Sequence, residues 1–162
     1  MQLSIHYTDH MVAEAGSYSP SAAKPAQVMA SWAKLGLPIQ VIEPSPVTLE
    51  HDAQMVSDIL SCQINNGFSN RSSNVAESLP YTTGAMLSAA RGALDNGYGA
   101  IAPCSGFHHA GYSFVGGFGT FNGLLRLSTG LREDRSGIRQ GTRHVIPPNI
   151  NSASNLPVGE SE

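Results

Sequence analysis

The sequence predicts an α/β protein with a mostly parallel sheet. Stretches that alternate like β-strands are separated by stretches whose apolar residues recur at helical spacing, in the order strand, helix, strand, helix, helix, strand. Strands joined through helices usually pair in parallel, because the helical crossover returns the chain to the same end of the sheet. With 162 residues, the chain is long enough for one domain with a hydrophobic core.

The first half of the chain supplies two strands and two helices. We expect strands at residues 3–7 and 39–42, and helices at residues 21–33 and 50–61. Leu3, Ile5 and Tyr7 alternate with polar residues, as in a strand. Ser21 can cap the first helix, and Gly36 lies just past its end. These elements form the start of a parallel sheet.

An adjacent histidine and aspartate, His51 and Asp52, lie in the first turn of the second predicted helix. Such a pair occurs in acid–base sites, but a carboxylate at this position also complements the helix dipole. The interpretation that we favour is that Asp52 serves the helix dipole.

The segment from Cys62 to Pro80 has neither helical nor strand periodicity. Its asparagine, glycine and serine residues are typical of turns. Because Phe68, Arg71 and Tyr81 can anchor it, we interpret it as a loop at the rim of a site. The third helix is then expected to start at Thr82 or Thr83.

The third helix ends at Asn96-Gly97, and residues 98–102 form a buried strand. A loop with two adjacent histidines follows this strand. Ligand sites of open α/β sheets form at the carboxyl ends of parallel strands. This loop is therefore the best candidate for a functional site.

His108 and His109 lie in a stretch, residues 103–123, that is dense in glycine and phenylalanine. Histidine exchanges protons near neutral pH, glycine permits close backbone approach, and phenylalanine can wall an apolar channel. Three interpretations of the pair stay open: proton transfer beside a metal, metal ligation, and stabilisation of a turn. For an isolated histidine pair, the turn is the favoured interpretation.

The wider stretch carries a more specific signal. The residues at 105–110, Gly116-Gly117-Phe118 and Phe121-Asn122 resemble the motifs of the histone deacetylase family. This family includes bacterial deacetylases and acetylpolyamine amidohydrolases. The predicted helices at 51–60 and 81–94 agree with it, so the resemblance covers about residues 1–124.

The resemblance implies a partial three-layer arginase/deacetylase-like fold, a catalytic zinc ion and hydrolysis of acetyl-lysine or acetylpolyamine amides. By position, His108 and His109 match the family's catalytic pair, which transfers protons and binds the zinc-bound water. Phe107, Gly117 and Phe118 match the substrate channel. Gly119 departs from the family, which often has cysteine there.

The metal ligands of the family are missing from this sequence. They come from an Asp-X-His segment and a later aspartate, and the chain has no Asp-X-His. The carboxylates that orient the histidines and the tyrosine that polarises the substrate carbonyl also belong to this missing region, and no tyrosine follows Tyr112. We therefore expect no metal site, no bound zinc and little or no activity. The alternative is a non-catalytic binding module that pairs with a full-length homologue, or with itself, through an exposed sheet edge.

The character of the chain changes after about Leu124. Residues 125–162 hold five of the nine basic residues and end in a segment rich in serine, asparagine and proline. We interpret residues 1–124 as the N-terminal part of a deacetylase-like domain and residues 125–162 as an unrelated, disordered tail. A frameshift or a fusion would produce such a change.

Composition and charge exclude several classes of partner. The formal net charge is −3, which argues against binding to nucleic acid or to anionic membranes. No apolar run approaches the roughly 20 residues of a membrane helix, and the N-terminus alternates rather than forming a signal peptide. Two cysteines fit a reducing compartment. The sequence thus predicts a soluble, cytoplasmic protein.

Overall fold

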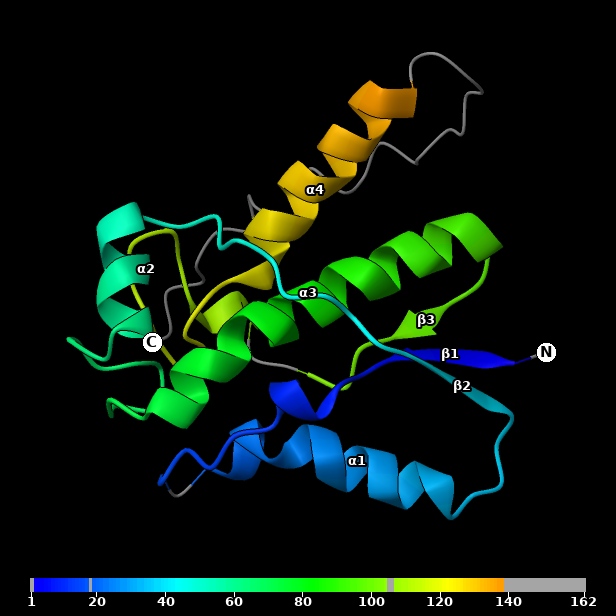
Figure 1. Cartoon of the computed structure of the whole chain (residues 1–162), viewed down its shortest axis with the longest axis horizontal. Coiled ribbons are helices and arrows are strands. Elements are labelled where there is room, and N and C mark those ends of the chain that lie inside the picture. Colours follow the sequence, from blue (N-terminus) through cyan, green and yellow to red (C-terminus); the bar gives the residue numbers. More distant parts are fainter. Residues whose placement is uncertain (1, 18, 105–106, 139–162) are drawn as a thin grey trace, which may run out of the picture.

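A small parallel sheet forms the centre of the fold. The computed structural model describes residues 2–17, 19–104 and 107–138. The strands are β1 (Leu3–His6), β2 (Ile39–Ile42) and β3 (Ala100–Ile101), in the order β2-β1-β3. Figure 1 shows β1 between the other two strands. In the parallel register, Ser4 of this central strand lies opposite Gln40 on one side and Ala100 on the other. The predicted α/β class and parallel sheet are confirmed. The prediction of a buried strand over residues 98–102 is wrong in part, because β3 has only two residues and is half-buried.

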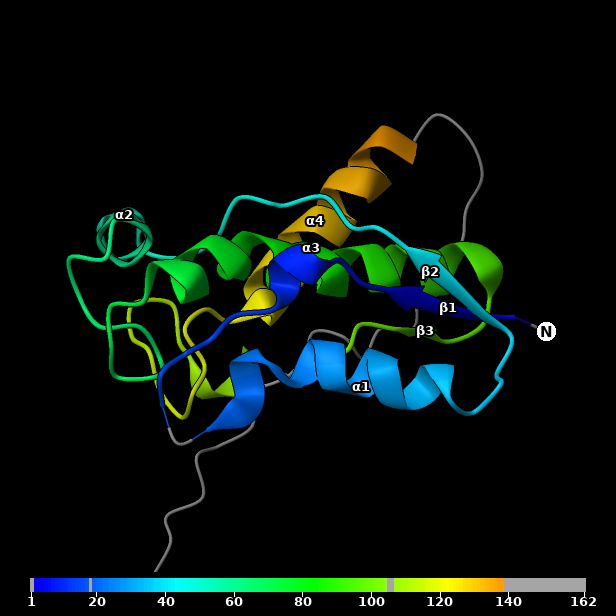
Figure 2. The same ribbon diagram turned by 60° about the horizontal axis from the view of Figure 1, so that its bottom comes forward.

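Helices cover both faces of this sheet. The helices are α1 (Lys24–Ala33), α2 (Ala53–Leu60), α3 (Ser73–Asn96) and α4 (Gly123–Ile138), with short 3-10 turns at Asp9–Met11, Pro20–Ala22 and Phe107–His109. In both views, α3 lies on one side of the sheet and α1 on the other (Figure 1, Figure 2). Ile5 and His6 point to opposite faces, and both are buried, at 1% and 2% exposure.

The largest difference from the sequence prediction is the length of α3. The loop predicted up to Pro80 ends at Ser72, whose hydroxyl caps the helix by accepting a hydrogen bond from the Val75 N–H group. The prediction of a loop over residues 73–80 is therefore wrong. Pro80 lies inside the helix, and its carbonyl accepts a hydrogen bond from the Val47 N–H group. Proline lacks one helical N–H group, but packing of Val75 and Leu79 into the core outweighs that loss.

Other helix boundaries follow local hydrogen bonding. Ser21, predicted as the cap of α1, lies instead in the 3-10 turn that precedes it. At α2, the Asp52 carboxylate accepts the Met55 N–H group at 2.9 Å, so Asp52 is the N-cap. Gly97 ends α3 with φ of +69°, as expected for a C-terminal glycine.

The main hydrophobic core lies between the segment after β1, α2 and the first half of α3. Its buried members are Ala13, Ala15, Met55, Ile59, Val75, Leu79 and Phe121. Phe121 brings the chain after the histidine loop into this core. The core therefore joins the candidate site to the scaffold that carries it.

Helix α4 crosses the predicted boundary at Leu124. It packs closely on α3, since a Cβ atom on Gly130 would lie 2.9 Å from Leu87 Cδ1. Residues 125–138 of the predicted tail are thus helical, and residues 139–162 lie outside the described part of the chain. The division of the chain into two units stays a prediction. In the described part, no helix combines the length and apolar character needed to cross a bilayer.

Gly84 sets how closely α3 approaches the segment before α2. A Cβ atom there would clash with the Ser45 carbonyl oxygen, which belongs to backbone that cannot rotate away. We expect Gly84→Ala to lower the free energy of unfolding by about 1–3 kcal/mol, although alanine is the better helix former by about 1 kcal/mol. Urea denaturation followed by circular dichroism measures the change.

Gly99→Ala is the matched control, because no atom lies within 4 Å of the added methyl group. A Gly84→Ala protein at least as stable as the parent would contradict the close approach.

Candidate functional site

The two predicted catalytic histidines lie together in the 3-10 turn Phe107–His109, beyond the carboxyl end of β3. Their ring centroids are 3.9 Å apart, and the ring planes are tilted by 41°. Both side chains are exposed, whereas Phe107 is half-buried. The pair is thus open to solvent and to a ligand approaching from outside.

A tight turn formed by residues 116–119, here called the glycine turn, supports His109. The backbones of Gly116 and Gly119 exchange two hydrogen bonds, of 3.0 and 2.7 Å. Gly117 and Phe118 between them have φ of +52° and +63°, the requirement of a type I′ turn. A Cβ atom on Gly117 would lie 2.7 Å from Cγ of His109. The backbone of Gly117 therefore packs against the imidazole ring, and only glycine fits there.

Phe118 adopts a left-handed backbone conformation that aromatic residues rarely adopt. Its ring lies 5.9 Å from the ring of Phe68, measured between centroids. Both rings line a partly open cavity of about 60 Å³. The unusual backbone thus directs an aromatic side chain into the interior instead of toward solvent.

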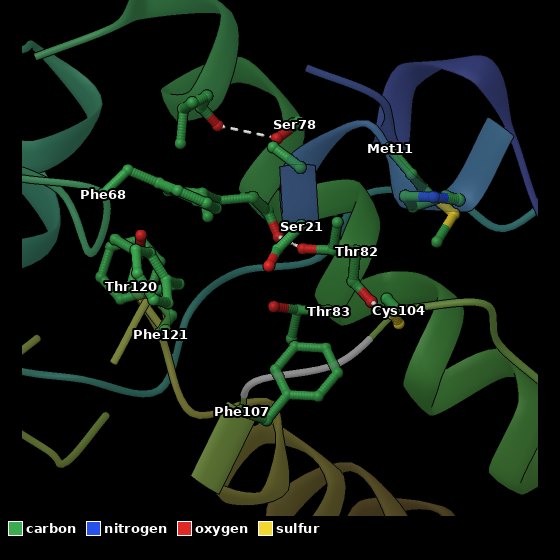
Figure 3. Close-up of a pocket in the computed structure, with 16 residues that line it drawn as sticks. Met11, Ser21, Phe68, Ser78, Thr82, Thr83, Cys104, Phe107, Thr120 and Phe121 are labelled. Atoms are coloured by element: carbon green, nitrogen blue, oxygen red, sulfur yellow. Dashed lines mark hydrogen bonds between the residues drawn. The ribbon is translucent and has the colours of Figure 1, made fainter. Parts of the chain in front are cut away.

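The cavity lies between α3, the 3-10 turn before α1 and the chain that follows the histidines. Figure 3 shows Phe68, Phe107, Thr120 and Phe121 on one side and Met11 and Cys104 on the other. Two predicted channel residues, Phe107 and Phe118, line it. The third, Gly117, and the two histidines are not among its lining residues. Their place is at the surface beside it.

The polar groups of the cavity are neutral. The Thr83 hydroxyl points into the cavity and has no hydrogen-bond partner among the described residues, although Thr83 is only 2% exposed (Figure 3). Burial raises the pKa of the Cys104 thiol to about 12, so Cys104 stays protonated at neutral pH. The cavity therefore suits a small neutral group with one hydrogen-bonding atom rather than an ion.

Asn122 connects the histidine loop to the rest of the fold. Its Nδ2 donates to the Ala110 carbonyl at 3.0 Å, and its Oδ1 accepts the Leu124 N–H group at 3.0 Å. Its backbone N–H donates to Nε2 of His51 at 2.8 Å. The sequence pattern predicted no role for His51. The only available signal was its position beside an N-cap residue, which does not identify a partner 71 residues away.

The donor groups of the described residues do not fit a catalytic zinc ion. Such a site needs about three protein ligands and one open position. In the described part of the chain, no three histidine, cysteine, aspartate or glutamate side chains lie close enough to hold a metal. His108 and His109 supply only two nitrogen-bearing side chains, without a carboxylate to complete the set.

Neither a scan against protein-family models nor a search of the curated proteins finds a match to this chain. The resemblance to deacetylases therefore rests on the motifs of the sequence itself.

The contact between Gly117 and His109 predicts an unusually costly substitution. Gly117→Ala introduces both a left-handed alanine and a clash with the imidazole. Gly16→Ala is the matched control, because Gly16 has φ of +61° but no atom within 4 Å of the added methyl group. We expect the control to lose about 1 kcal/mol and Gly117→Ala to lose about 1 kcal/mol more, measured by urea denaturation. In NMR spectra, only Gly117→Ala should shift the ring signals of His109; equal effects of both variants would rule out the contact.

Proposed function

We propose that this chain carries the proton-transfer and acyl-channel half of a deacetylase-type amidohydrolase site. The observation that carries the proposal is the packing of His109 on Gly117, beside a cavity lined by Phe107 and Phe118. Residues that match the family motif at separate positions of the sequence thus lie in one neighbourhood. The parallel sheet between α1 and α3 supports the finer proposal of a partial three-layer arginase/deacetylase-like fold.

The chemistry of amide hydrolysis explains why these groups belong together. One group must remove a proton from the attacking water, and one must give a proton to the leaving amine; histidine performs both tasks near neutral pH. A small neutral cavity suits an acetyl group, whose methyl is apolar and whose carbonyl accepts a hydrogen bond. The Thr83 hydroxyl is a candidate donor to such a carbonyl, because this hydroxyl has no hydrogen-bond partner among the described residues. Acetyl-lysine and acetylpolyamines are therefore the proposed ligands.

We also propose that this chain alone does not hydrolyse amides. In the family, a zinc ion polarises the substrate carbonyl and activates water. The sequence has no Asp-X-His, and the described residues offer no ligand set for zinc. We propose that the chain binds acetylated amines without hydrolysing them. The free thiols of Cys62 and Cys104 support the proposed cytoplasmic location.

Binding and hydrolysis are tested separately. In an NMR titration with N-acetyl-lysine amide, we expect shifts at Phe118 and Thr120, which line the cavity. Phe118→Ala should weaken binding about tenfold, because it removes a large apolar wall. In parallel, we expect no hydrolysis above the level of His109→Ala, and less than about 0.1 zinc ion per chain by mass spectrometry.

Phe114→Ala is the matched control for binding, because Phe114 lies in the same loop but is 61% exposed. Equal binding by the parent, Phe118→Ala and Phe114→Ala would refute the acyl channel. Turnover that both His108→Ala and His109→Ala abolish would refute the proposed inactivity.

The second candidate function is a binding module that pairs through a sheet edge. Strand β3 pairs only with β1 among the described strands, so its other side is open. Close to this edge, Tyr98 is 67% exposed and Leu94 is 45% exposed. Open edges with apolar neighbours favour strand addition. A second copy, or a full-length homologue, is the proposed partner.

Sedimentation velocity tests this second function. Pairing through β3 should yield a dimer that Ile101→Pro dissociates, because proline cannot donate to an added strand. The experiment is done at about 100 μM, a concentration high enough to detect a weak dimer. A monomer under these conditions would argue against pairing between copies.

A further inference from the structure

His51 lies where three parts of the fold meet. It directly precedes the N-cap of α2, and it accepts a hydrogen bond from Asn122 at the start of α4. Its ring stacks on Tyr112, with centroids 6.5 Å apart and planes 8° apart, and packs at a tilt on Phe121. The residue is 7% exposed. An imidazole is thus enclosed between the α2 segment and the chain that leaves the histidine pair.

The hydrogen bond from Asn122 determines the tautomer of this ring. A backbone N–H group can only donate, so Nε2 of His51 must keep its lone pair and the proton must lie on Nδ1. Nδ1 is buried and has no partner among the described residues. A second proton would have to go to Nε2, where it would face another donor. The protonated ring is therefore incompatible with this contact.

Several contacts depend on Asn122 keeping its place. Its side chain holds the Ala110 carbonyl, directly after the histidine pair, and the Leu124 N–H group in the first turn of α4. The segment after the histidine pair also contacts the start of α2, where the Asp52 N–H group donates to the Tyr112 carbonyl at 3.1 Å. Displacement of Asn122 would thus reach both the histidine loop and α4.

We propose that His51 is a proton-sensitive latch: protonation at Nε2 breaks the hydrogen bond from the Asn122 backbone and releases the start of α4, with the segment after the histidine pair, from residues 50–52. This inference does not depend on the proposed deacetylase function, because it concerns only the attachment of these segments.

The charged and titratable groups around His51 determine when the latch opens. Burial lowers the pKa of His51 below 6.5, and the neighbouring Glu50 carboxylate opposes this effect more weakly. Glu50 is already paired with Arg126 of α4 at 3.0 Å, and Asp52 caps α2. Among the described residues, the stacked Tyr112 is a further titratable neighbour. The ring is therefore neutral at pH 7, and the latch opens as the pH falls below 6.5.

An NMR pH titration of the full chain from about pH 7.5 to 4.5 tests the latch. The ring nitrogens of His51 should report an unprotonated Nε2 at high pH and a midpoint below 6.5. The backbone amide signals of Asn122 and Leu124 should follow that same midpoint. Hydrogen exchange of the Asn122 amide, relative to its intrinsic rate at each pH, should accelerate about tenfold below the midpoint.

Two variants separate the latch from other titrations. In His51→Gln, the side-chain amide oxygen can accept the same N–H group but does not titrate, so the pH response of Asn122 should disappear. In His109→Gln, a nearby exposed imidazole is removed and the response of Asn122 should persist. The proposal is wrong if the Asn122 amide is unchanged while the His51 ring titrates in the parent protein, a result that requires no variant to fold. A His51 midpoint at or above 6.5, or a persisting Asn122 response in folded His51→Gln, would also overturn it.

Discussion

The hydrogen bond between the Asn122 backbone and His51 is the constraint on which the candidate site depends. Residues 107–122 contain little regular structure beyond the 3-10 turn Phe107–His109, so their position must come from contacts with the scaffold. Phe121 enters the core shared by α2 and α3, and Asn122 then ties the chain to His51, to Ala110 and to the first turn of α4. The same loop is also held by the hydrogen bond from the Asp52 N–H group to the Tyr112 carbonyl and by the contact between the rings of Phe68 and Phe118. A buried imidazole thus contributes to holding an exposed loop in place.

The site separates two environments within a few residues. The glycine turn places the Gly117 backbone against the ring of His109 at the surface, while Phe118, the next residue, points into a cavity whose polar groups are neutral. Both residues have a left-handed backbone conformation, which lets the chain reverse its direction within a two-residue turn. Proton exchange needs contact with water, whereas recognition of an acyl group needs an apolar pocket. The glycine turn places an exposed imidazole and a cavity-lining aromatic ring at adjacent positions, the two environments that the proposed function requires.

The sequence was informative where local chemistry decides the structure and misleading where distant packing does. Strand β2, the end of α3 at Gly97 and the helix-start role of Asp52 were predictable, since each depends on neighbouring residues. The first turns of α3 were missed because residues 62–80 lack helical periodicity and are rich in turn-forming residues, whereas the burial of Val75 and Leu79 stabilises the helix there. The histidine loop could be located from its composition, but its contact with Gly117 depends on a turn type that composition alone does not specify. The partnership of His51 with Asn122 spans 71 residues and has no local signal.

The contacts that hold the histidine loop do not depend on metal ligands. The groups that position His109, Phe107 and Phe118 come from α3, the glycine turn and Asn122, all within the segment that resembles the deacetylases. None of these contacts requires a metal ion, because they are made by backbone groups, aromatic rings and one amide side chain. In a zinc amidohydrolase, the ligands and the carbonyl-polarising group act on top of such a framework rather than building it. Under the proposed function, a chain without these ligands would lack the means of stabilising the transition state while keeping the framework around the histidine pair, which is why we propose binding without turnover.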